Sequence, residues 1–424
     1  MERDDAALRE AIRAEASRAR QAVAALADEP VAAALGEAAR VLHTQRDWIL
    51  EVNARDREAA EPRLDAGSLD RLTLTPARLD EIESQLDVMA ALPPLERVIE
   101  RWTTADGLDV ASMRIPVGVV GANFEARPNV AVDVASQLLK SLNGCVLRTG
   151  SAATGTVTAL VDDVLRPALE SVGLPPDAVG LVRSPGHDGA EALVSLPDEI
   201  PLVILRGSGP TTASLARAAA SHGVAVIAHA EGGGVLYVDR SAEGNRAETL
   251  IANSLDRLGV CNRLNLLLVH DELAGRLDGF GEVLRQAGVE PRGTPRVCAV
   301  ASFTPLDVEI GHEWANDPER LASVTVDLVA GVAEAAEIAN RATSGLAAGI
   351  VADDPRAADD FLARYRGTAA FWHAPTRFAD GFALTGAPET GINVGWAPGP
   401  RGPVTYRDLW LRQFRVSGDG TQHR

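Results

Sequence analysis

One cysteine of this 424-residue sequence has neighbours suited to covalent chemistry. Cys261 stands in Gly259-Val260-Cys261-Asn262, directly before the apolar run Leu264–Val269. A thiol on such a loop can act as a nucleophile, and nearby backbone N–H groups can stabilise the oxyanion that forms on a carbonyl. A free cysteine is also a common small residue of apolar cores. We assign that simpler role to Cys145 and Cys298, which lie beside valines.

Arginine and glycine follow several apolar runs that we expect to be strands. Arg127 follows the run Val117–Val120, and the turns Arg148-Thr149-Gly150-Ser151 and Arg206-Gly207-Ser208-Gly209 follow two further runs. Loops beyond the carboxyl ends of parallel strands bind ligands in α/β sheets, and a guanidinium there suits a phosphate or a carboxylate. Glycine lets a phosphate approach the backbone. Ordinary strand-to-helix turns also contain these residues, so neither turn identifies a site alone.

Several kinds of catalytic site are excluded by residues that the sequence lacks. Lys140 is the only lysine, so the chain has no P-loop, and Schiff-base chemistry would have to use that residue. His312-Glu313 begins like a zinc-protease helix, but Asn316 stands where the second histidine is required. No Cys-x-x-Cys pair is present either. We therefore predict that the protein has no metal site.

Composition narrows the class of protein and its partners. Apolar residues make up 46% and charged residues 24%, which is typical of a globular chain of two or three domains. The formal net charge of −18 disfavours binding to nucleic acid or to an anionic membrane surface. No apolar run is long enough for a membrane helix, and no apolar stretch follows the charged start. We expect a cytoplasmic protein that binds neither nucleic acid nor membrane.

The elements that position these residues change in character near residue 115. Residues 6–27, 31–60 and Leu69–Leu92 have helical composition, with Thr75-Pro76 as a plausible N-cap and first helical residue. Short apolar runs then alternate with helical segments, as in βαβ units with buried parallel strands. The first series of strands is Val117–Val120, Cys145–Leu147, Gly180–Val182, Leu202–Leu205 and Val224–Ala228. The second is Val235–Val238, Leu264–Val269, Val324–Val329, Gly349–Val351 and Ala369–Trp372. The glycine run Glu231–Gly234 between them predicts a hinge between two α/β domains.

Several segments resemble the γ-glutamyl phosphate reductase (glutamate-5-semialdehyde dehydrogenase) family of the aldehyde dehydrogenase superfamily, and they follow one another along the chain in the order expected for that family. The segments around Arg127, Cys261 and Arg377 resemble that family and not merely the superfamily. The resemblance rests on Asn53–Asp56, Leu69–Leu74, Pro116–Gly121, Glu125–Val130, Leu139–Ser141, Gly259–Asn262, Thr376–Phe378 with Asp380-Gly381, and Arg401–Pro403.

The resemblance implies an aldehyde dehydrogenase-like α/β fold with two Rossmann-like domains and a small oligomerisation arm. Cofactor binding would fall to residues 1–99 and 115–232, and catalysis to residues 233–395. Residues 100–114 and 396–424 would form oligomerisation or bridging segments of a homodimer or homotetramer.

The resemblance also implies the chemistry, which is reduction of an activated acyl group to an aldehyde with NADPH, through a thioester on Cys261, as in proline biosynthesis. Arg127 and Asn129 would be catalytic with Cys261. The cofactor would be held by Arg148, Gly150, Ser151, Arg206, Gly207, Ser208 and Gly209, and the substrate by Asn262, Thr376, Arg377, Glu389 and Arg401. No water-activating base is needed, because the thioester is reduced rather than hydrolysed. Ala230 takes the position of that base, and Glu231 lies one residue away.

Departures from the family pattern cluster in the half that should hold the substrate. Leu346 and Ala348 replace a histidine and a glutamate, and Gly399 replaces a histidine. We therefore expect glutamate-5-semialdehyde to be a poor substrate and a less polar, longer or carrier-bound acyl group to be better. Two alternatives stay open. The first is a dehydrogenase that oxidises an aldehyde, which the segment Gly345–Gly349 favours and the missing base disfavours. The second is a non-catalytic scaffold, which the retained Cys261 loop disfavours.

Overall fold

The chain folds into two compact α/β units, each with its own parallel sheet. The computed structural model describes residues 2–184, 186–207, 209–229, 232–317, 320, 322–395 and 400–422. Unit 1 comprises Met1–Ala228, Ala387–Gly391 and Val404–Arg424, and unit 2 comprises His229–Gly386 and Ile392–Pro403. The predicted α/β fold class is confirmed. Among the described residues, none of the helices has the length and apolar character that a membrane crossing requires.

Unit 1 begins with five helices, and the two longest predicted helical stretches are each divided in two. These helices are α1 (Glu2–Val23), α2 (Asp28–Thr44), α3 (Arg46–Ala60), α4 (Ala66–Leu72) and α5 (Pro76–Ala91). The predicted helix Leu69–Leu92 is interrupted because Thr75 is extended and caps α5, its Oγ1 accepting from the backbone N–H of Arg78 at 3.2 Å. Pro76 then takes the first helical position, where its missing N–H has no cost.

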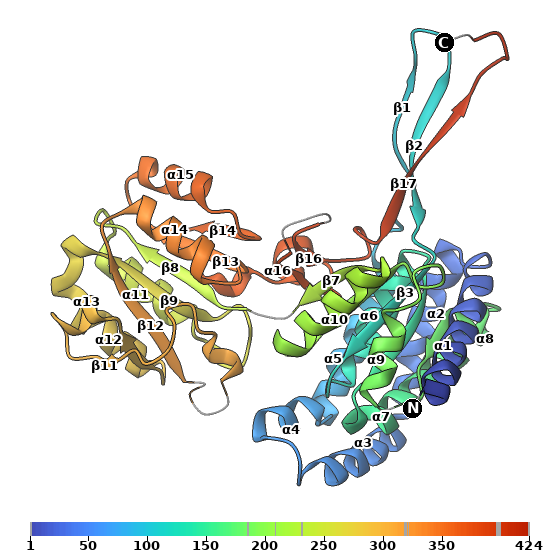
Figure 1. Cartoon of the computed structure of the whole chain (residues 1–424), viewed down its shortest axis with the longest axis horizontal. Helices are drawn as coiled ribbons and strands as arrows, with labels where there is room; N and C mark the ends of the chain where they lie inside the picture. The colour runs from blue at the N-terminus through green and yellow to red at the C-terminus, as the bar shows by residue number, and fades with distance from the viewer. Residues whose placement is uncertain are drawn as a thin grey trace. The chain divides into compact units, whose positions relative to one another are not determined.

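The sheet of unit 1 has five strands in the order β5-β4-β3-β6-β7, of which β3 to β6 are parallel, with helices on both faces (Figure 1). The strands are β3 (Val119–Phe124), β4 (Gly144–Thr149), β5 (Val179–Leu181), β6 (Leu202–Arg206) and β7 (Ala225–His229). The connecting helices are α6 (Asn129–Lys140), α7 (Thr154–Ala159), α8 (Arg166–Ser171), α9 (His187–Leu193) and α10 (Gly209–His222). Alternate strand residues enter two cores: α2, α5 and α6 cover one face, and α1, α9 and α10 cover the other.

A long antiparallel ribbon extends from unit 1 (Figure 1). We call it the arm; it consists of β1 (Val98–Thr103), β2 (Asp109–Pro116) and β17 (Trp410–Ser417), with β2 in the centre. The arm includes residues 100–103 and 109–114, and the bridging role expected for segments 100–114 and 396–424 stays a prediction. Val404, Tyr406 and Leu409 pack into the core of unit 1 instead of joining the arm.

Unit 2 has a seven-stranded parallel sheet in the order β11-β10-β12-β9-β8-β13-β14. The strands are β8 (Gly234–Val238), β9 (Leu264–His270), β10 (Glu290–Gly293), β11 (Thr304–Pro305), β12 (Ser323–Val329), β13 (Ala347–Val351) and β14 (Ala369–Trp372). One face is covered by α11 (Gly244–Asn253), α12 (Leu277–Gln286) and α13 (Pro295–Cys298), and the other by α14 (Val332–Ala342) and α15 (Pro355–Arg364). Helix α16 (Gly381–Thr385) precedes the short pair β15 (Gly391–Asn393) and β16 (Gly402–Val404).

Candidate active site

The nucleophile candidate lies in a turn that is packed against consecutive glycines in unit 2. Cys261 is half-buried, just before β9, and its carbonyl oxygen accepts from the N–H of Gly233 at 2.6 Å. The N–H of Gly234 donates to the carbonyl of Arg263 at 2.8 Å. A Cβ atom at position 232 would lie 2.5 Å from the Cβ of Cys261. These glycines, which we expected to form a hinge, therefore allow the backbone at the start of β8 to approach the thiol loop closely.

Asn262 ties the thiol loop to the turn that follows β14. Its side-chain amide nitrogen donates to the carbonyls of Arg377 and Ala379, both at 3.1 Å. Its amide oxygen accepts from the guanidinium of Arg377, and its carbonyl accepts from the Thr376 hydroxyl at 2.9 Å. Arg377 also donates to Asp256 at 2.6 Å. In this structure the three predicted substrate residues Asn262, Thr376 and Arg377 bind one another and fix the loop that carries Cys261.

The other two predicted substrate residues are not part of this network. Arg401 donates to the backbone carbonyls of Arg366 and Val394, the latter at 3.1 Å. Glu389 belongs to unit 1, whereas Arg401 and the thiol loop belong to unit 2. Their roles in substrate binding stay predictions.

Three predicted segments meet at the carboxyl edge of the unit 1 sheet. A Cβ atom at Gly207 would lie 2.9 Å from Glu125 Oε1, and one at Gly150 would lie 3.8 Å from Glu125 Cα. Gly150 precedes a short 3-10 turn that begins at Ser151, and Gly209 opens the 14-residue helix α10. Ser208 lies outside the described residues. The edge thus combines closely approaching glycine backbone with the start of a helix, an arrangement that suits a phosphate.

The two arginines of these turns differ in accessibility. Arg148 is 5% exposed, and its guanidinium donates to the carbonyl of Gly186 at 2.6 Å and to Asn123 Oδ1 at 3.1 Å. Burial lowers the pKa of Arg148, and the carboxylate of Glu125 opposes this change. Arg206, at the end of β6, is only half-buried. A ligand phosphate would therefore reach Arg206 more readily than Arg148.

The segment after β3 contains an exposed arginine and a buried carboxyl group. Arg127 is exposed in the turn that leads into α6, and Asn129 Nδ2 donates to Asp133 Oδ2 at 3.0 Å. Burial raises the pKa of Asp133 to about 6, while Arg206 and the Asn129 hydrogen bond act in the opposite direction. The sequence analysis did not identify Asp133, because a carboxyl group within an apolar helix carries no local sign of its partners.

The residues that depart from the family pattern lie in the interior of unit 2 or outside the described residues. Leu346 and Ala348 are fully buried, and Ala348 packs in the core beneath α14 and α15. Ser344 Oγ, two residues earlier, donates to the carbonyl of Gly232 at 2.8 Å. Ala230, Glu231 and Gly399 are not among the described residues.

Proteins of a known family resemble this chain over most of its length. The model of the aldehyde dehydrogenase family matches residues 1–287. A γ-glutamyl phosphate reductase of Paramagnetospirillum magneticum is 34% identical over 411 residues, which is 95% of each chain. That of Kineococcus radiotolerans is 36% identical over 398 residues, 92% of this chain and 90% of the relative. The crystal structure of γ-glutamyl phosphate reductase from Thermotoga maritima has a TM-score of 0.89 at 29% identity, covering 97% of this chain and all of that one.

Proposed function

The chain belongs to the aldehyde dehydrogenase family, and we propose that it reduces an activated acyl group, such as an acyl phosphate, to the corresponding aldehyde. The observation that carries this proposal is the half-buried thiol of Cys261 on a close-packed glycine support. Relatives of this chain at 34% and 36% identity over more than nine-tenths of its length are γ-glutamyl phosphate reductases.

In the proposed reaction Cys261 carries the acyl group. Its sulfur attacks the acyl carbon, the bond to the phosphate oxygen breaks, and inorganic phosphate leaves a thioester on the enzyme. A bound nicotinamide supplies the hydride that converts the thioester to the aldehyde, which releases the thiolate. We assign the oxyanion to backbone N–H groups of the thiol loop. The catalytic roles of Arg127 and Asn129, with the guanidinium of Arg127 suited to the departing phosphate, rest on the resemblance to the family.

We propose NADPH as the cofactor. Membership of the family supports a nicotinamide cofactor, and the choice of the phosphorylated form rests on the cations at the edge of the unit 1 sheet. Gly150 and Gly207 lie at this edge beside Glu125, and α10 begins there at Gly209, where the positive end of the helix dipole favours an anion. Arg206 is the cation that we assign to the 2′-phosphate, whereas Arg148 supports the same edge from inside.

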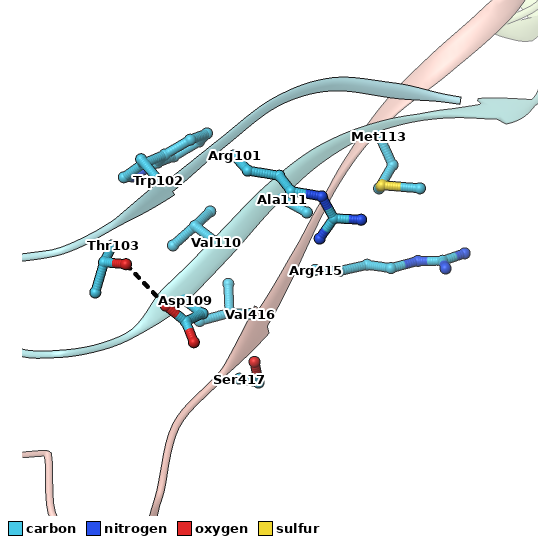
Figure 2. A pocket seen from close by; sticks show the side chains of 10 residues that line it. All are labelled: Arg101, Trp102, Thr103, Asp109, Val110, Ala111, Met113, Arg415, Val416 and Ser417. Carbon is cyan, nitrogen blue, oxygen red and sulfur yellow. Dashed lines mark hydrogen bonds between the residues drawn. The ribbon is translucent and has the colours of Figure 1, made fainter. Parts of the chain in front are cut away.

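We also propose that the arm mediates self-association into a homodimer or homotetramer. Both outer strands of the arm present large exposed apolar residues, namely Ile99 and Trp102 on β1 and Leu411, Phe414 and Val416 on β17. The hollow in Figure 2 lies among the same strands, with Val110 and Val416 beside Arg101 and Arg415. Exposed apolar side chains on a ribbon with free edges favour association with another chain.

The decisive experiment is the variant Cys261→Ala, assayed in the oxidative direction with aldehyde, phosphate and NADP at 340 nm. We expect turnover to be abolished while binding of the reduced cofactor, followed by its fluorescence, is unchanged. Cys298→Ala is the matched control, because this cysteine is also half-buried but lies in α13. Turnover of Cys261→Ala within a few-fold of the wild type would disprove the mechanism.

A further inference from the structure

We propose that Asp56, together with Asn53, is a positioning residue that fixes the turn Arg148–Ser151 for binding of the nicotinamide cofactor. We call these four residues the cofactor turn, and the inference rests on their proposed role in holding the cofactor. Asn53 and Asp56 belong to α3, and the reaction proposed above gives them no role. They act on the cofactor turn through the start of α7, the helix that follows it.

Asp56 caps α7 from another helix. Its Oδ2 accepts from the backbone N–H and from the hydroxyl of Thr156, both at 2.7 Å. Thr156 is the third residue of α7, where a backbone N–H has no partner within the helix. A polar side chain just before the helix usually binds this group, but Ala153 stands there and cannot. A carboxylate from α3 therefore does the work of a local cap, at the end of the helix whose dipole favours negative charge.

The backbone at the start of α7 fits closely against this carboxylate. A Cβ atom at Gly155 would lie 2.7 Å from Asp56 Oδ1, so glycine is the residue that allows the approach. Helix α3 also packs against α7 and against the short 3-10 turn Ser151–Ala153. The place of the α7 start is thus set by its contacts with α3.

Short hydrogen-bonded links join the α7 start to the cofactor turn. The N–H of Ala153 donates to the carbonyl of Gly150 at 3.1 Å, and the Thr154 hydroxyl donates to the carbonyl of Ser151 at 3.3 Å. Ser151 itself is exposed. A shift of the α7 start would therefore move Gly150 and Ser151, the two residues of the turn that we assign to the cofactor together with Arg148.

Asn53 locks the same hydroxyl from the other side. Its side chain is 2% exposed, and Nδ2 donates to Thr156 Oγ1 at 3.2 Å and to the carbonyl of Leu72 at 2.9 Å. Its Oδ1 accepts from the N–H of Leu74 at 2.7 Å. The Thr156 hydroxyl thus accepts from Asn53 and donates to Asp56. These bonds join the segments Asn53–Asp56 and Leu69–Leu74, both part of the family resemblance, to the helix behind the cofactor turn.

The position of this network predicts which kinetic constants depend on it. All of its residues belong to unit 1, whereas the thiol of Cys261 belongs to unit 2. Loss of Asp56 should therefore weaken cofactor binding and leave the chemical step intact. It should affect NADPH and NADH alike, because we assign the 2′-phosphate to Arg206 and not to the cofactor turn.

The test is a fluorescence titration of NADPH and NADH with the variants Asp56→Ala, Thr156→Val and Thr156→Ser. We expect Asp56→Ala to raise the Kd of both cofactors about fivefold or more, the equivalent of one lost helix cap. Its kcat at saturating cofactor should be unchanged, as for the loss of an interaction that serves binding alone. Thr156→Val should have a smaller effect, because the backbone N–H still binds the carboxylate. Thr156→Ser should restore the wild-type Kd, because serine keeps the hydroxyl.

The matched control is Thr75→Ala, which removes the cap of another helix of unit 1, α5. It should lower the melting temperature without changing either Kd. A wild-type Kd in a folded Asp56→Ala protein would overturn the proposal, and so would an equal rise in Thr75→Ala, which would indicate general destabilisation. If Asp56→Ala does not fold, an unchanged Kd in Thr156→Val overturns it instead. The titration is independent of turnover, so a failure of the proposed function, revealed by an active Cys261→Ala enzyme, remains distinguishable.

Discussion

Gly232 lies so close to Cys261 that a Cβ atom at position 232 would be 2.5 Å from the cysteine Cβ. Carbon atoms without a bond between them do not approach so closely, so any side chain at position 232 must displace the thiol loop. We expect Gly232→Ala to lower kcat at least tenfold and to destabilise the protein by about 1–3 kcal/mol. Steady-state kinetics and urea unfolding measure the two effects.

The matched control is Gly279→Ala in α12, where a Cβ atom would meet nothing within 4 Å. This variant should keep its activity, and it should be as stable as the wild type or more so, because alanine is the better helix former. A fully active Gly232→Ala enzyme would show that the thiol loop has room to move without consequence.

The second prediction separates the two arginines of the cofactor edge. Arg206→Gln should raise the KM for NADPH about tenfold or more and leave the KM for NADH nearly unchanged, since only NADPH carries the 2′-phosphate. Arg148→Gln should lower the melting temperature and weaken the binding of both cofactors alike, because the buried guanidinium binds the side chain of Asn123 and the carbonyl of Gly186. Arg217→Gln, an exposed position on α10, is the control. A selective loss of NADPH binding in Arg148→Gln alone would reverse our assignment.

The third prediction concerns the pH dependence of stability. The pKa of Asp133 in the folded protein is about 6, above the ordinary value of 3.8, so folding favours the protonated form. Its stabilising contribution is complete below about pH 4 and is lost as the pH rises through 6. Asp133→Asn should therefore flatten the stability profile over this range by about 2 kcal/mol, measured by urea unfolding. The exposed Asp188→Asn should leave the profile unchanged, and an equally steep profile in Asp133→Asn would argue against the assignment.

The fourth prediction tests the arm. Phe414 on β17 is 55% exposed and lies edge-on to Trp102, with ring centroids 6.0 Å apart. We expect Phe414→Asp to reduce the oligomer to smaller species in sedimentation experiments, because a carboxylate is costly to bury in an apolar contact. Val300→Asp introduces the same charge at a residue that is 58% exposed in unit 2, and the assembly should survive it. An unchanged oligomer in Phe414→Asp would place the interface elsewhere.

The central strands could be predicted from the sequence because buried parallel strands are continuous apolar runs. The run Leu264–Val269 differs from β9 by one residue. Strand β10 was missed because its four residues, Glu290–Gly293, include a glutamate, a proline and an arginine, and it is recognisable only by its pairing with β12. Strand β1 was missed for a similar reason, since most of its residues are exposed.

The site was predictable where one residue carries the signal, and not where distant segments meet. Cys261 stood out through its glycine neighbours, but nothing local indicates that the carboxylate bound to Thr156 belongs to Asp56, 100 positions earlier. The packing of α3 against α7 brings them together. The glycine run was visible too, but its close contact with Cys261 depends on the pairing of β8 with β9.

The last prediction concerns the acyl group. Leu346 and Ala348 stand where the family pattern has a histidine and a glutamate, and both side chains are fully buried, so neither position offers a polar group or a place for water. Sites built to hydrogen-bond a polar substrate group discriminate by roughly 10⁴-fold against analogues that lack it. A site without those groups loses this preference, and burying the charged head of an amino acid without partners is costly. We therefore expect glutamate-5-semialdehyde, assayed with phosphate and NADP, to have a kcat/KM at least tenfold below that of a less polar aldehyde or of an acyl thioester in the reverse direction. One of the related γ-glutamyl phosphate reductases, assayed in parallel, controls for the quality of the glutamate-5-semialdehyde preparation. If glutamate-5-semialdehyde is the best of the panel, with a kcat/KM above about 10⁴ M⁻¹ s⁻¹, the argument from Leu346 and Ala348 is wrong, and the acyl group is that of the relatives.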